Sequence, residues 1–330
     1  MLTAKPSFSL KAQITMPGDK SISHRAILLG SLSLGTTVIN NFLRSDDCLR
    51  TIQAMQNLGV PIHIACDNQI EIQGVAIHNL KTPSQPIDCG NSGTLMRILS
   101  GVLAATSFET HLTGDASLCN RPMDRIVEPL QKMGASITGV KKNGCVTPPL
   151  IIKGNPCLQS IDYKLAVPSA QVKSCLLMAG LFAQGKTKVH EPEKSRDHTE
   201  RLFPVFGGSI TREDNVIGIT PQVLQGASLT IPGDISSAAF FIVAATLIPN
   251  SHLVIKDVGL NPTRMGLLHI LRLMGANIQT RIKEGFEPCG EITIRSSNLQ
   301  GIEVPASLIV AAIDEFPALF IASAFAKGET

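Results

Sequence analysis

The feature that most constrains the fold of this chain is an internal repeat. Four segments share one pattern, in which an amphipathic helix ends at a glycine and a strand begins. They are MQNLGVPI (55–62), LQKMGASI (130–137), PVFGGSI (204–210) and LRLMGANI (271–278). Glycine is favoured after the last helical residue because it adopts the left-handed conformation at little cost. The glycines are residues 59, 134, 207 and 275, so the steps are 75, 73 and 68 residues.

Two further signals follow the same period. Alternating, β-type stretches come after apolar helical stretches at 35–40, 109–114, 185–190 and 251–256. Small polar residues stand before the helices in MPGDKSIS, VPSAQVKS and IPGDISSA, and more loosely in CGNSGTLM. Because solenoid repeats span only about 20–50 residues, this longer period predicts repeated α/β subdomains.

Composition excludes several classes of protein. The 330 residues are 44% hydrophobic, enough for about two domains. A net charge of +3, no Trp and one Tyr argue against a nucleic-acid partner. No uninterrupted apolar run reaches about 18 residues and no signal peptide is visible, so no membrane segment is predicted. Eight Cys without a CxxC pair predict neither disulfides nor a metal cluster, which fits a reducing cytoplasm.

The stretch MPGDKSISHRA has the features of an anion site. A helix N-terminus exposes unpaired N–H groups and a partial positive charge, so phosphate binds there readily. Gly18 permits a tight turn, Ser21 can cap the helix, and Lys20 and Arg25 add positive charge. The competing interpretation is an ordinary capped helix with both basic side chains in solvent.

Two other turns have the same features of an anion site. CGNSGTLMR allows close backbone approach at Gly93 and ends in Arg97, although an ordinary glycine-rich turn explains it equally well. VPSAQVKS offers Ser169, Gln171 and Lys173, although Ser is a common helix cap. None of the turns is a Walker A loop or a dinucleotide-binding fingerprint.

The segment CNRPMDRIVEPL places Arg121 and Arg125 on either side of Pro122. Proline is favoured at the first helical position, which puts Arg125 on the first turn of a helix. This arginine is a candidate anion ligand. The alternative is a solvated side chain paired with Asp124 or Glu128.

Two more helix starts carry candidate residues. SRDHTERLF opens with Arg196 and His198, and a single histidine without a second one at helical spacing predicts a surface residue rather than a metal ligand. IDEFPAL places Asp314 and Glu315 before a strongly apolar helix. Acidic residues are common at helix N-termini. A carboxylate at the repeat position where other repeats hold phosphate-binding groups can also transfer protons.

Taken in order, eight motifs resemble the 5-enolpyruvylshikimate-3-phosphate (EPSP) synthase family. They are GDKSISHRA, GNSGTLMR, RPMDR, SAQVK, SRDHTER, GDISSAAF, NPTR and DEFPAL, and together they cover essentially the whole chain. The RDHTE, GDIS, SAQVK and NPTR forms resemble the bacterial class II enzymes, which are often tolerant of the inhibitor glyphosate. Gly93 departs from those class II members that carry Ala there, so the glyphosate response stays open.

The resemblance implies a two-lobed α/β enolpyruvyl transferase fold built from βαβαββ units, an inside-out α/β barrel with helix N-termini facing a cleft. One lobe is expected at 19–234. The other is expected at 1–18 plus 235–330, incomplete at its C-terminus because six units are expected. The family's KESDR-type segment and further basic ligands would follow Thr330. We therefore expect a longer protein, and these 330 residues alone to be inactive and to bind phosphoenolpyruvate poorly.

The implied reaction joins phosphoenolpyruvate to the 5-hydroxyl of shikimate 3-phosphate and releases phosphate, in the pathway to aromatic amino acids. It needs no metal and no other cofactor. The implied partners are these two small molecules, with no nucleic acid and no membrane, and the enzyme is expected to be a cytoplasmic monomer.

The resemblance also assigns site residues. Lys20 would contact both substrates and transfer protons, and Asp314 would contact the shikimate hydroxyls and act as the base for the 5-hydroxyl. The remaining shikimate 3-phosphate ligands would be Ser21, Arg25, Ser169, Ala170, Gln171 and Arg196. Phosphoenolpyruvate would contact Asn91, Gly93, Arg125 and Gln171. Glu315 is expected to be structural.

Two alternatives remain at this point. The related enolpyruvyl transferase acting on UDP-N-acetylglucosamine follows its first-turn Lys with Asn and uses a loop Cys. Here Ser21 follows Lys20, and Cys119 lies only two residues before Arg121, closer than that family's spacing. The second alternative is a non-catalytic anion-binding protein on the same scaffold, which would not need Asp314.

Overall fold

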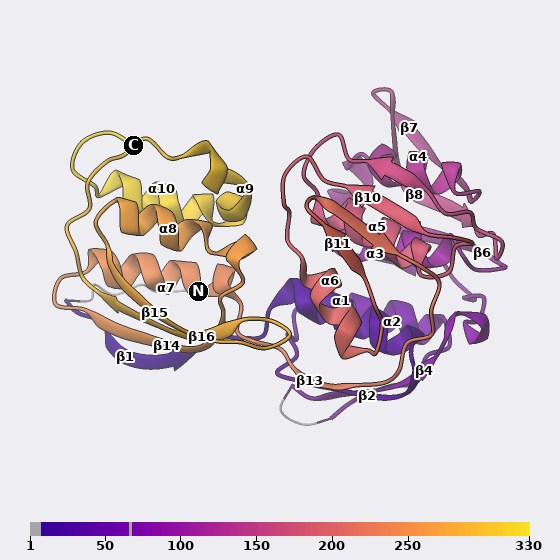
Figure 1. Cartoon of the computed structure of the whole chain (residues 1–330), viewed down its shortest axis with the longest axis horizontal. Coiled ribbons are helices and arrows are strands. Elements are labelled where there is room, and N and C mark those ends of the chain that lie inside the picture. The colour runs from indigo at the N-terminus through magenta and orange to yellow at the C-terminus, as the bar shows by residue number, and fades with distance from the viewer. Residues whose placement is uncertain (1–7, 66–67) are drawn as a thin grey trace. The chain divides into compact units, whose positions relative to one another are not determined.

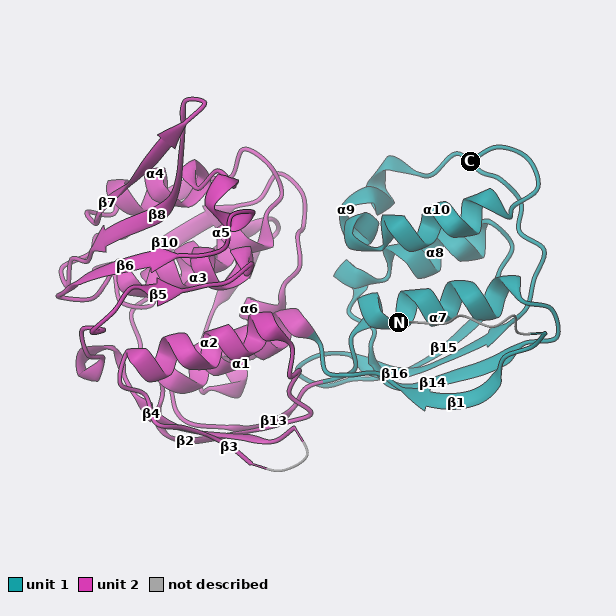
Figure 2. Cartoon of the chain, turned by 180° about the vertical axis from the view of Figure 1, so that it is seen from behind, with its two compact units in different colours: residues 1–19, 232–330 teal, residues 20–231 magenta. Residues whose placement is uncertain are grey.

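The computed structural model describes residues 8–65 and 68–330 (Figure 1). Cys66 and residues 1–7, where the second expected lobe begins, lie outside the described residues. The chain forms two compact units (Figure 2): unit 1 contains residues 1–19 and 232–330, and unit 2 contains residues 20–231. The lobe limits of 19–234 and 1–18 plus 235–330 stay a prediction.

Unit 2 contains three four-stranded sheets, ordered β13-β2-β4-β3, β5-β6-β8-β7 and β9-β10-β12-β11. The first two strands named in each sheet are parallel and the other neighbours are antiparallel. The strands are β2 (Leu34–Asn40), β3 (Ile62–Ile64), β4 (Ile70–Val75), β5 (Ile87–Asp88), β6 (Glu109–Thr113), β7 (Ser136–Lys142), β8 (Cys145–Lys153), β9 (Asp162–Lys164), β10 (Thr187–His190), β11 (Thr211–Glu213), β12 (Val216–Ile219) and β13 (Ser228–Thr230). The repeated α/β subdomain is confirmed.

The helices of unit 2 lie inside its sheets (Figure 1). They are α1 (Lys20–Leu32), α2 (Asp46–Asn57), α3 (Gly93–Leu103), α4 (Asp124–Lys132), α5 (Ala170–Gly180) and α6 (His198–Val205), with short 3₁₀ turns η1 (Ile77–Asn79) and η2 (Leu118–Asn120). Helices α1, α3 and α5 are buried on nearly all sides. A helix surrounded by protein must be apolar all round, as these sequences are.

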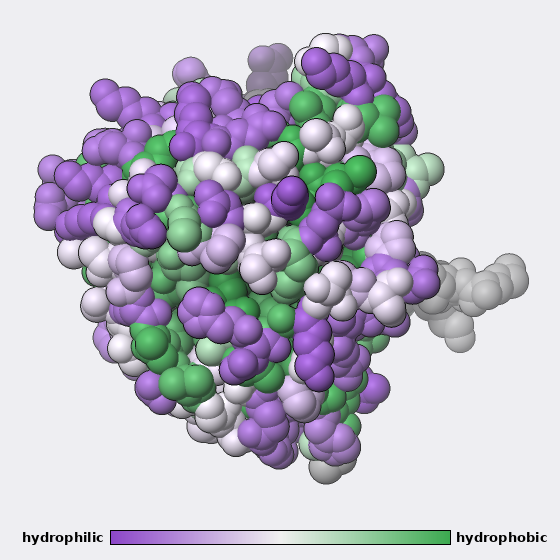
Figure 3. All heavy atoms as spheres, turned by 90° about the vertical axis from the view of Figure 1, so that its right-hand side faces the viewer, coloured by the Kyte–Doolittle hydropathy of each residue, from purple (hydrophilic) through white to green (hydrophobic). Residues whose placement is uncertain are grey.

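The three inner helices of unit 2 run in the same direction. Leu32, Ala105 and Leu181, at or just beyond their C-terminal ends, line one cavity of about 360 Å³. The N-termini therefore lie together at the opposite end, about 16 Å away for eleven residues of helix. Figure 3 shows the surface of unit 2 on the right-hand side of Figure 1, where hydrophobic residues are exposed between hydrophilic ones.

Unit 1 contains one sheet of the same kind, ordered β1-β14-β16-β15, with helices on one face (Figure 2). Its strands are β1 (Lys11–Thr15), β14 (His252–Gly259), β15 (Asn277–Lys283) and β16 (Cys289–Arg295). Its helices are α7 (Ile235–Leu247), α8 (Gly266–Leu273), α9 (Ile309–Ala312) and α10 (Phe316–Ala324), with 3₁₀ turns η3 (Pro262–Arg264), η4 (Ala306–Leu308) and η5 (Ile313–Glu315). Its core gathers apolar side chains such as Ile242, Ile255 and Leu268.

The glycines of the repeat are confirmed as helix-ending residues. Gly59, Gly134, Gly207 and Gly275 directly follow the C-caps of α2, α4, α6 and α8. Their φ angles are 87°, 104°, 71° and 95°, in the region that favours glycine. This local signal was therefore sufficient to predict the repeat boundaries.

The first strands of two repeats are exchanged. Strand β1 precedes α1 in the chain but pairs with β14 of unit 1, whereas β13 precedes α7 but pairs with β2 of unit 2. The chain passes between the units after residue 19 and after residue 231. Within unit 1, Asp19 N–H donates to the Pro232 carbonyl at 2.9 Å and Asp234 N–H donates to that of Pro17 at 2.8 Å. These bonds hold the two crossing segments side by side.

The helical run Ala306–Ala324 in unit 1 is long and apolar enough to cross a membrane by length and composition alone. The sequence predicted no such segment because two carboxylates interrupt the apolar run. Ala312, Ala318 and Leu319 of this run pack in the core of unit 1, so a core helix also explains its composition. Its other face is open, with the Phe320 side chain 66% exposed.

Candidate anion-binding site

The first turn of α5 is joined to the first turn of α3. Ser169 is the N-cap of α5, and its hydroxyl accepts a hydrogen bond from Val172 N–H at 3.4 Å. Gln171 accepts a hydrogen bond from Arg97 Nη1 at 2.8 Å and donates one to the Thr94 hydroxyl at 3.0 Å. Two helix N-termini, each with unpaired N–H groups, therefore meet at Gln171.

Arg25 joins the same turn of α5 to α1 and α6. Its buried guanidinium donates to the Thr199 hydroxyl at 2.7 Å, to the Ser174 hydroxyl at 2.8 Å and to the Ser21 carbonyl at 2.9 Å. Ser174 in turn donates to the Ala170 carbonyl at 2.6 Å. The expectation that Ser21 caps α1 is wrong, because the helix begins one residue earlier, at Lys20.

Two arginines lie beside Gly93, the first residue of α3. A Cβ added to Gly93 would lie 2.8 Å from Arg97 Nη1 and 3.3 Å from Arg121 Nη1, so the absence of a side chain permits their approach. Burial, followed by the charges of Arg121 and Arg125, lowers the pKa of Arg97 from its ordinary value. Like charges held together in this way favour a bound anion.

Arg125 lies on the first turn of α4 and is exposed. Asp124 accepts a hydrogen bond from Val146 N–H and Glu128 pairs with Lys132 at 2.7 Å. The exposure of Arg125 fits the solvated alternative as well as a ligand role, so its assignment stays a prediction. Pro122 precedes the helix by two residues, so its prediction as the first helical residue is wrong.

Asn91 is oriented by its neighbours. Its amide group donates to an Asp115 carboxylate oxygen at 2.7 Å, and its carbonyl oxygen accepts from Arg121 Nη2 at 2.9 Å. Hydrogen bonds from Leu118 N–H and from Asn91 lower the pKa of Asp115. This carboxylate stays charged and orients the amide toward the arginines.

Lys20 and Arg196 are the other predicted ligands in unit 2. Lys20 begins α1, and its ammonium group forms an ion pair with Asp47 while the side chain stays 45% exposed. Arg196 is half-buried just before α6. These contacts do not test whether Lys20 or Arg196 binds a substrate, so both assignments stay predictions.

In unit 1, Asp314 is exposed in η5 and Glu315 beside it is buried. Glu315 accepts hydrogen bonds from the Ser236 hydroxyl and from Arg264, the latter at 3.2 Å. Arg264 also lies 3.5 Å from a carboxylate oxygen of Asp234. Among the described residues, no group of three or more His, Cys, Asp or Glu could hold a metal ion.

Burial and the Asp19 charge raise the pKa of Asp234 to about 6, against the opposing effect of Arg264. Asp234 is also the N-cap of α7, and its carboxylate accepts a hydrogen bond from Ser236 N–H at 2.9 Å. The acidic groups of unit 1 thus differ in role. Asp314 is exposed, whereas Asp234 and Glu315 are buried and lie within 3.5 Å of Arg264.

Two expectations about α5 and α6 are wrong. Lys173 was a candidate anion ligand, but its side chain is 1% exposed and its ammonium group pairs with Glu191 and Glu200. His198 was expected at the surface, but it is 1% exposed. Arg97 was placed in an anion-site motif but was not assigned to a substrate, although it follows Gly93 by one helical turn.

Comparison with known proteins identifies the family. The family model for EPSP synthase (3-phosphoshikimate 1-carboxyvinyltransferase) matches residues 4–330. The chain belongs to the EPSP synthase family. It is 50% identical over 330 residues to 3-phosphoshikimate 1-carboxyvinyltransferase of Legionella pneumophila strain Corby, which covers 99% of this chain and 75% of that protein. The enzyme of the same name from Methylococcus capsulatus is 49% identical, over 100% of this chain and 76% of that protein.

Solved structures are similar to this chain in fold. EPSP synthase from Acinetobacter baumannii superposes with a TM-score of 0.88 at 46% identity, over 97% of this chain and 72% of that one. The enolpyruvyl transferase NikO from Streptomyces tendae gives a TM-score of 0.75 at 16% identity, over 97% of this chain and 74% of that one, which supports the fold alone. The expected α/β fold of the EPSP synthases is thereby confirmed.

Proposed function

We propose that the function of this protein is the reaction for which its relatives are named, the transfer of the enolpyruvyl group of phosphoenolpyruvate to the 5-hydroxyl of shikimate 3-phosphate. That the 330 residues alone are inactive stays a prediction. C3 of phosphoenolpyruvate gains a proton while the 5-hydroxyl oxygen bonds to C2. The tetrahedral adduct then loses a proton from C3 and releases inorganic phosphate, which restores the enol double bond. Both substrates carry several negative charges, so the site must supply positive charge.

The single observation that carries the proposal is the junction at the first turn of α5. Through Ser174 and Gln171 this turn contacts Arg25 and Arg97, so two guanidinium groups lie at adjoining helix N-termini. Backbone N–H groups, hydroxyls and arginines together are the chemistry that phosphate prefers. We assign the phosphate of shikimate 3-phosphate to Ser21, Arg25, Ser169, Ala170, Gln171 and Arg196.

Phosphoenolpyruvate is assigned to the arginine cluster beside Gly93, with Asn91, Arg125 and Gln171 as ligands. Lys20 is assigned contact with both substrates and proton transfer at C3, for which its ion pair with Asp47 must give way to the substrate. Asp314 is assigned the base for the 5-hydroxyl. The exposure of Asp314 supports this choice over the buried Glu315, which is engaged by Arg264.

The remaining parts of the proposal concern the state of the protein. The mechanism uses no metal and no other cofactor, since proton transfer and anion stabilisation suffice for the chemistry. The partners are the two small-molecule substrates. We propose a cytoplasmic monomer, which fits the free thiols of the described cysteines.

The test is calorimetric titration of the chain with shikimate 3-phosphate and, separately, with UDP-N-acetylglucosamine. Only the first should bind saturably, and Arg196→Ala should weaken it about tenfold, as expected for loss of one charge-assisted contact. The matched control is Arg212→Ala, which removes a nearby arginine paired with Asp197 at 3.3 Å and should leave the affinity unchanged. Binding of UDP-N-acetylglucosamine instead would overturn the proposal.

A second measurement separates an enzyme from an anion-binding protein. Phosphate released from phosphoenolpyruvate is followed in the presence and absence of shikimate 3-phosphate. Release that depends on shikimate 3-phosphate and is abolished by Asp314→Asn supports the enzyme, and it would contradict the prediction that these 330 residues alone are inactive. Full release by the Asp314→Asn variant would remove this residue from the mechanism.

A further inference from the structure

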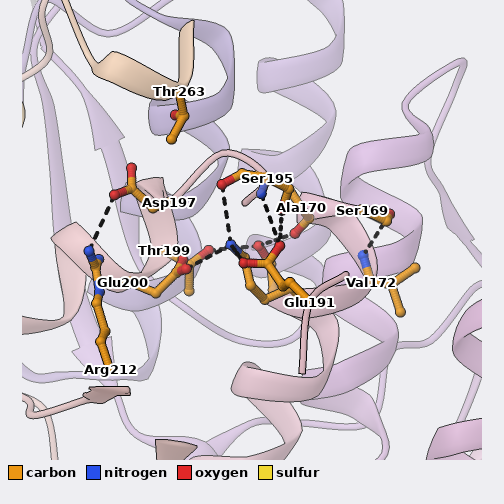
Figure 4. Close-up of polar contacts among 12 residues, drawn as sticks. Ser169, Ala170, Val172, Glu191, Ser195, Asp197, Thr199, Glu200, Arg212 and Thr263 are labelled. Carbon is orange, nitrogen blue, oxygen red and sulfur yellow. Dashed lines mark hydrogen bonds and ion pairs between the residues drawn. The ribbon is translucent and has the colours of Figure 1, made fainter. Parts of the chain in front are cut away.

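A fully buried ion cluster lies directly behind the first turn of α5. The Lys173 ammonium group is 2.8 Å from Glu191 Oε2 and 2.7 Å from Glu200 Oε1, and all three side chains are at most 3% exposed. Figure 4 shows the Glu191 and Glu200 side chains, which come from different segments. Glu191 follows β10, Lys173 lies in α5 and Glu200 lies in α6.

Stability alone does not account for this cluster. Two carboxylates and one ammonium group leave a net negative charge in the interior, and Glu200 Oε2 has no hydrogen-bond partner among the described residues. Removing such groups from water costs more than apolar residues of similar size would cost. A buried ion pair of this kind fixes geometry, because each charge has one low-energy position relative to its partner.

Lys173 connects the cluster to the proposed phosphate-binding turn. Lys173 N–H donates to the Ser169 carbonyl at 3.0 Å, so Lys173 closes the helical turn that contains Ser169, Ala170 and Gln171. The neighbouring residue Ser174 donates to the Ala170 carbonyl and accepts from Arg25. A shift at Lys173 would therefore move the N-cap and the backbone N–H groups of α5.

Glu191 connects the cluster to the segment that contains Arg196. Glu191 accepts hydrogen bonds from Ser195 N–H at 3.2 Å and from the Ser195 hydroxyl, and Lys173 lies 3.5 Å from the Ser195 carbonyl (Figure 4). Glu191 thus closes the loop immediately before Arg196. Glu200 ties α6 to the same ammonium group, and the adjacent Thr199 bonds Arg25.

We infer that Lys173 is a positioning residue for shikimate 3-phosphate: it fixes the Ser169–Gln171 turn, the Arg196 segment and α6 relative to one another without touching the ligand. This inference rests on the proposed function, in which shikimate 3-phosphate is the ligand. It goes beyond that function by assigning a positioning role to a residue that contacts no substrate.

The experiment compares shikimate 3-phosphate binding by the whole chain and its variants in calorimetric titrations. Lys173→Met should weaken binding at least about tenfold, since misplacing binding groups by about 1 Å has effects of that order or larger. The matched control is Lys132→Met, which removes an ammonium group 2.7 Å from Glu128 on the surface of the same unit and should leave the affinity unchanged. Shikimate without the phosphate should lose less affinity than shikimate 3-phosphate in Lys173→Met.

A second variant removes the risk that Lys173→Met fails to fold. In Lys173→Met/Glu191→Gln/Glu200→Gln no charge is left unpaired, and the amide oxygen introduced at position 191 can still accept from Ser195, so the chain should unfold cooperatively like the parent. A positioning role predicts that this folded triple variant still binds shikimate 3-phosphate at least about tenfold more weakly. Parental affinity in the triple variant would overturn the inference, whereas failure of the parent chain to bind shikimate 3-phosphate would overturn the proposed function itself.

Discussion

Gly101 lets α3 lie directly against the backbone of α5, and replacing it with alanine should separate the two helices. A Cβ at this position would lie 2.1 Å from the Cys175 carbonyl oxygen and 2.9 Å from the carbonyl carbon. Carbon atoms in contact need about 3.5 Å, so one helix must move by roughly 1 Å. The contact is with helix backbone, which cannot rotate away as a side chain can.

The expected loss of stability follows from two opposing terms. Overpacking of this severity costs about 3 kcal/mol, the upper part of the usual range. Alanine gains about 1 kcal/mol over glycine inside a helix. Gly101→Ala should therefore lower the free energy of unfolding by about 2 kcal/mol.

The matched control is Gly30→Ala in α1. There the added Cβ would lie 3.0 Å from the Thr37 side chain rather than from backbone, so a small adjustment accommodates it. We expect the stability of this variant to stay within about 1 kcal/mol of the parent. Urea unfolding followed by circular dichroism measures both variants. The reasoning is refuted if Gly101→Ala unfolds at the same urea concentration as Gly30→Ala or at a higher one.

Three further predictions concern the sites. Gly93→Ala should weaken phosphoenolpyruvate binding about tenfold in calorimetry by displacing Arg97, yet leave stability nearly unchanged because the new contact is the far end of a flexible side chain. The raised pKa of Asp234, about 6 against 3.8, means that the native state binds more protons between these values, so the free energy of unfolding should fall from about pH 4 to about pH 6. Asp234→Asn should lack this slope, and identical pH profiles in urea unfolding would contradict the assignment. Glu315→Gln should destabilise unit 1 by about 3 kcal/mol in thermal or urea unfolding by leaving Arg264 with less buried countercharge, whereas Asp314→Asn should not.

Much of the candidate site could be predicted from the sequence because its parts are local. Small polar residues before a helix are a local signal of its N-terminus, so the turn that holds Ser169 and Gln171 was predicted from its own sequence. Their ligand roles come from the family resemblance and stay predictions. Lys173 in the same motif was misassigned, since its partners lie further along the chain: Glu191 just after β10, the next element, and Glu200 in α6, the one after that. Whether a lysine faces solvent or two buried carboxylates depends on packing that no local pattern reports.

The sequence by itself determined the period of the repeat, the glycines that end its second helices and the turns that begin its first helices. Each of these depends on backbone conformation within a few residues. The local pattern did not decide which sheet each first strand joins: the expected lobe limits came from the family resemblance, and the tertiary structure gives the pairing itself. Strands β1 and β13 stand in equivalent positions before α1 and α7, but β1 pairs with β14 and β13 pairs with β2. Strand pairing is a contact between distant segments, and two strands with the same local pattern fit either sheet until the rest of the chain is packed.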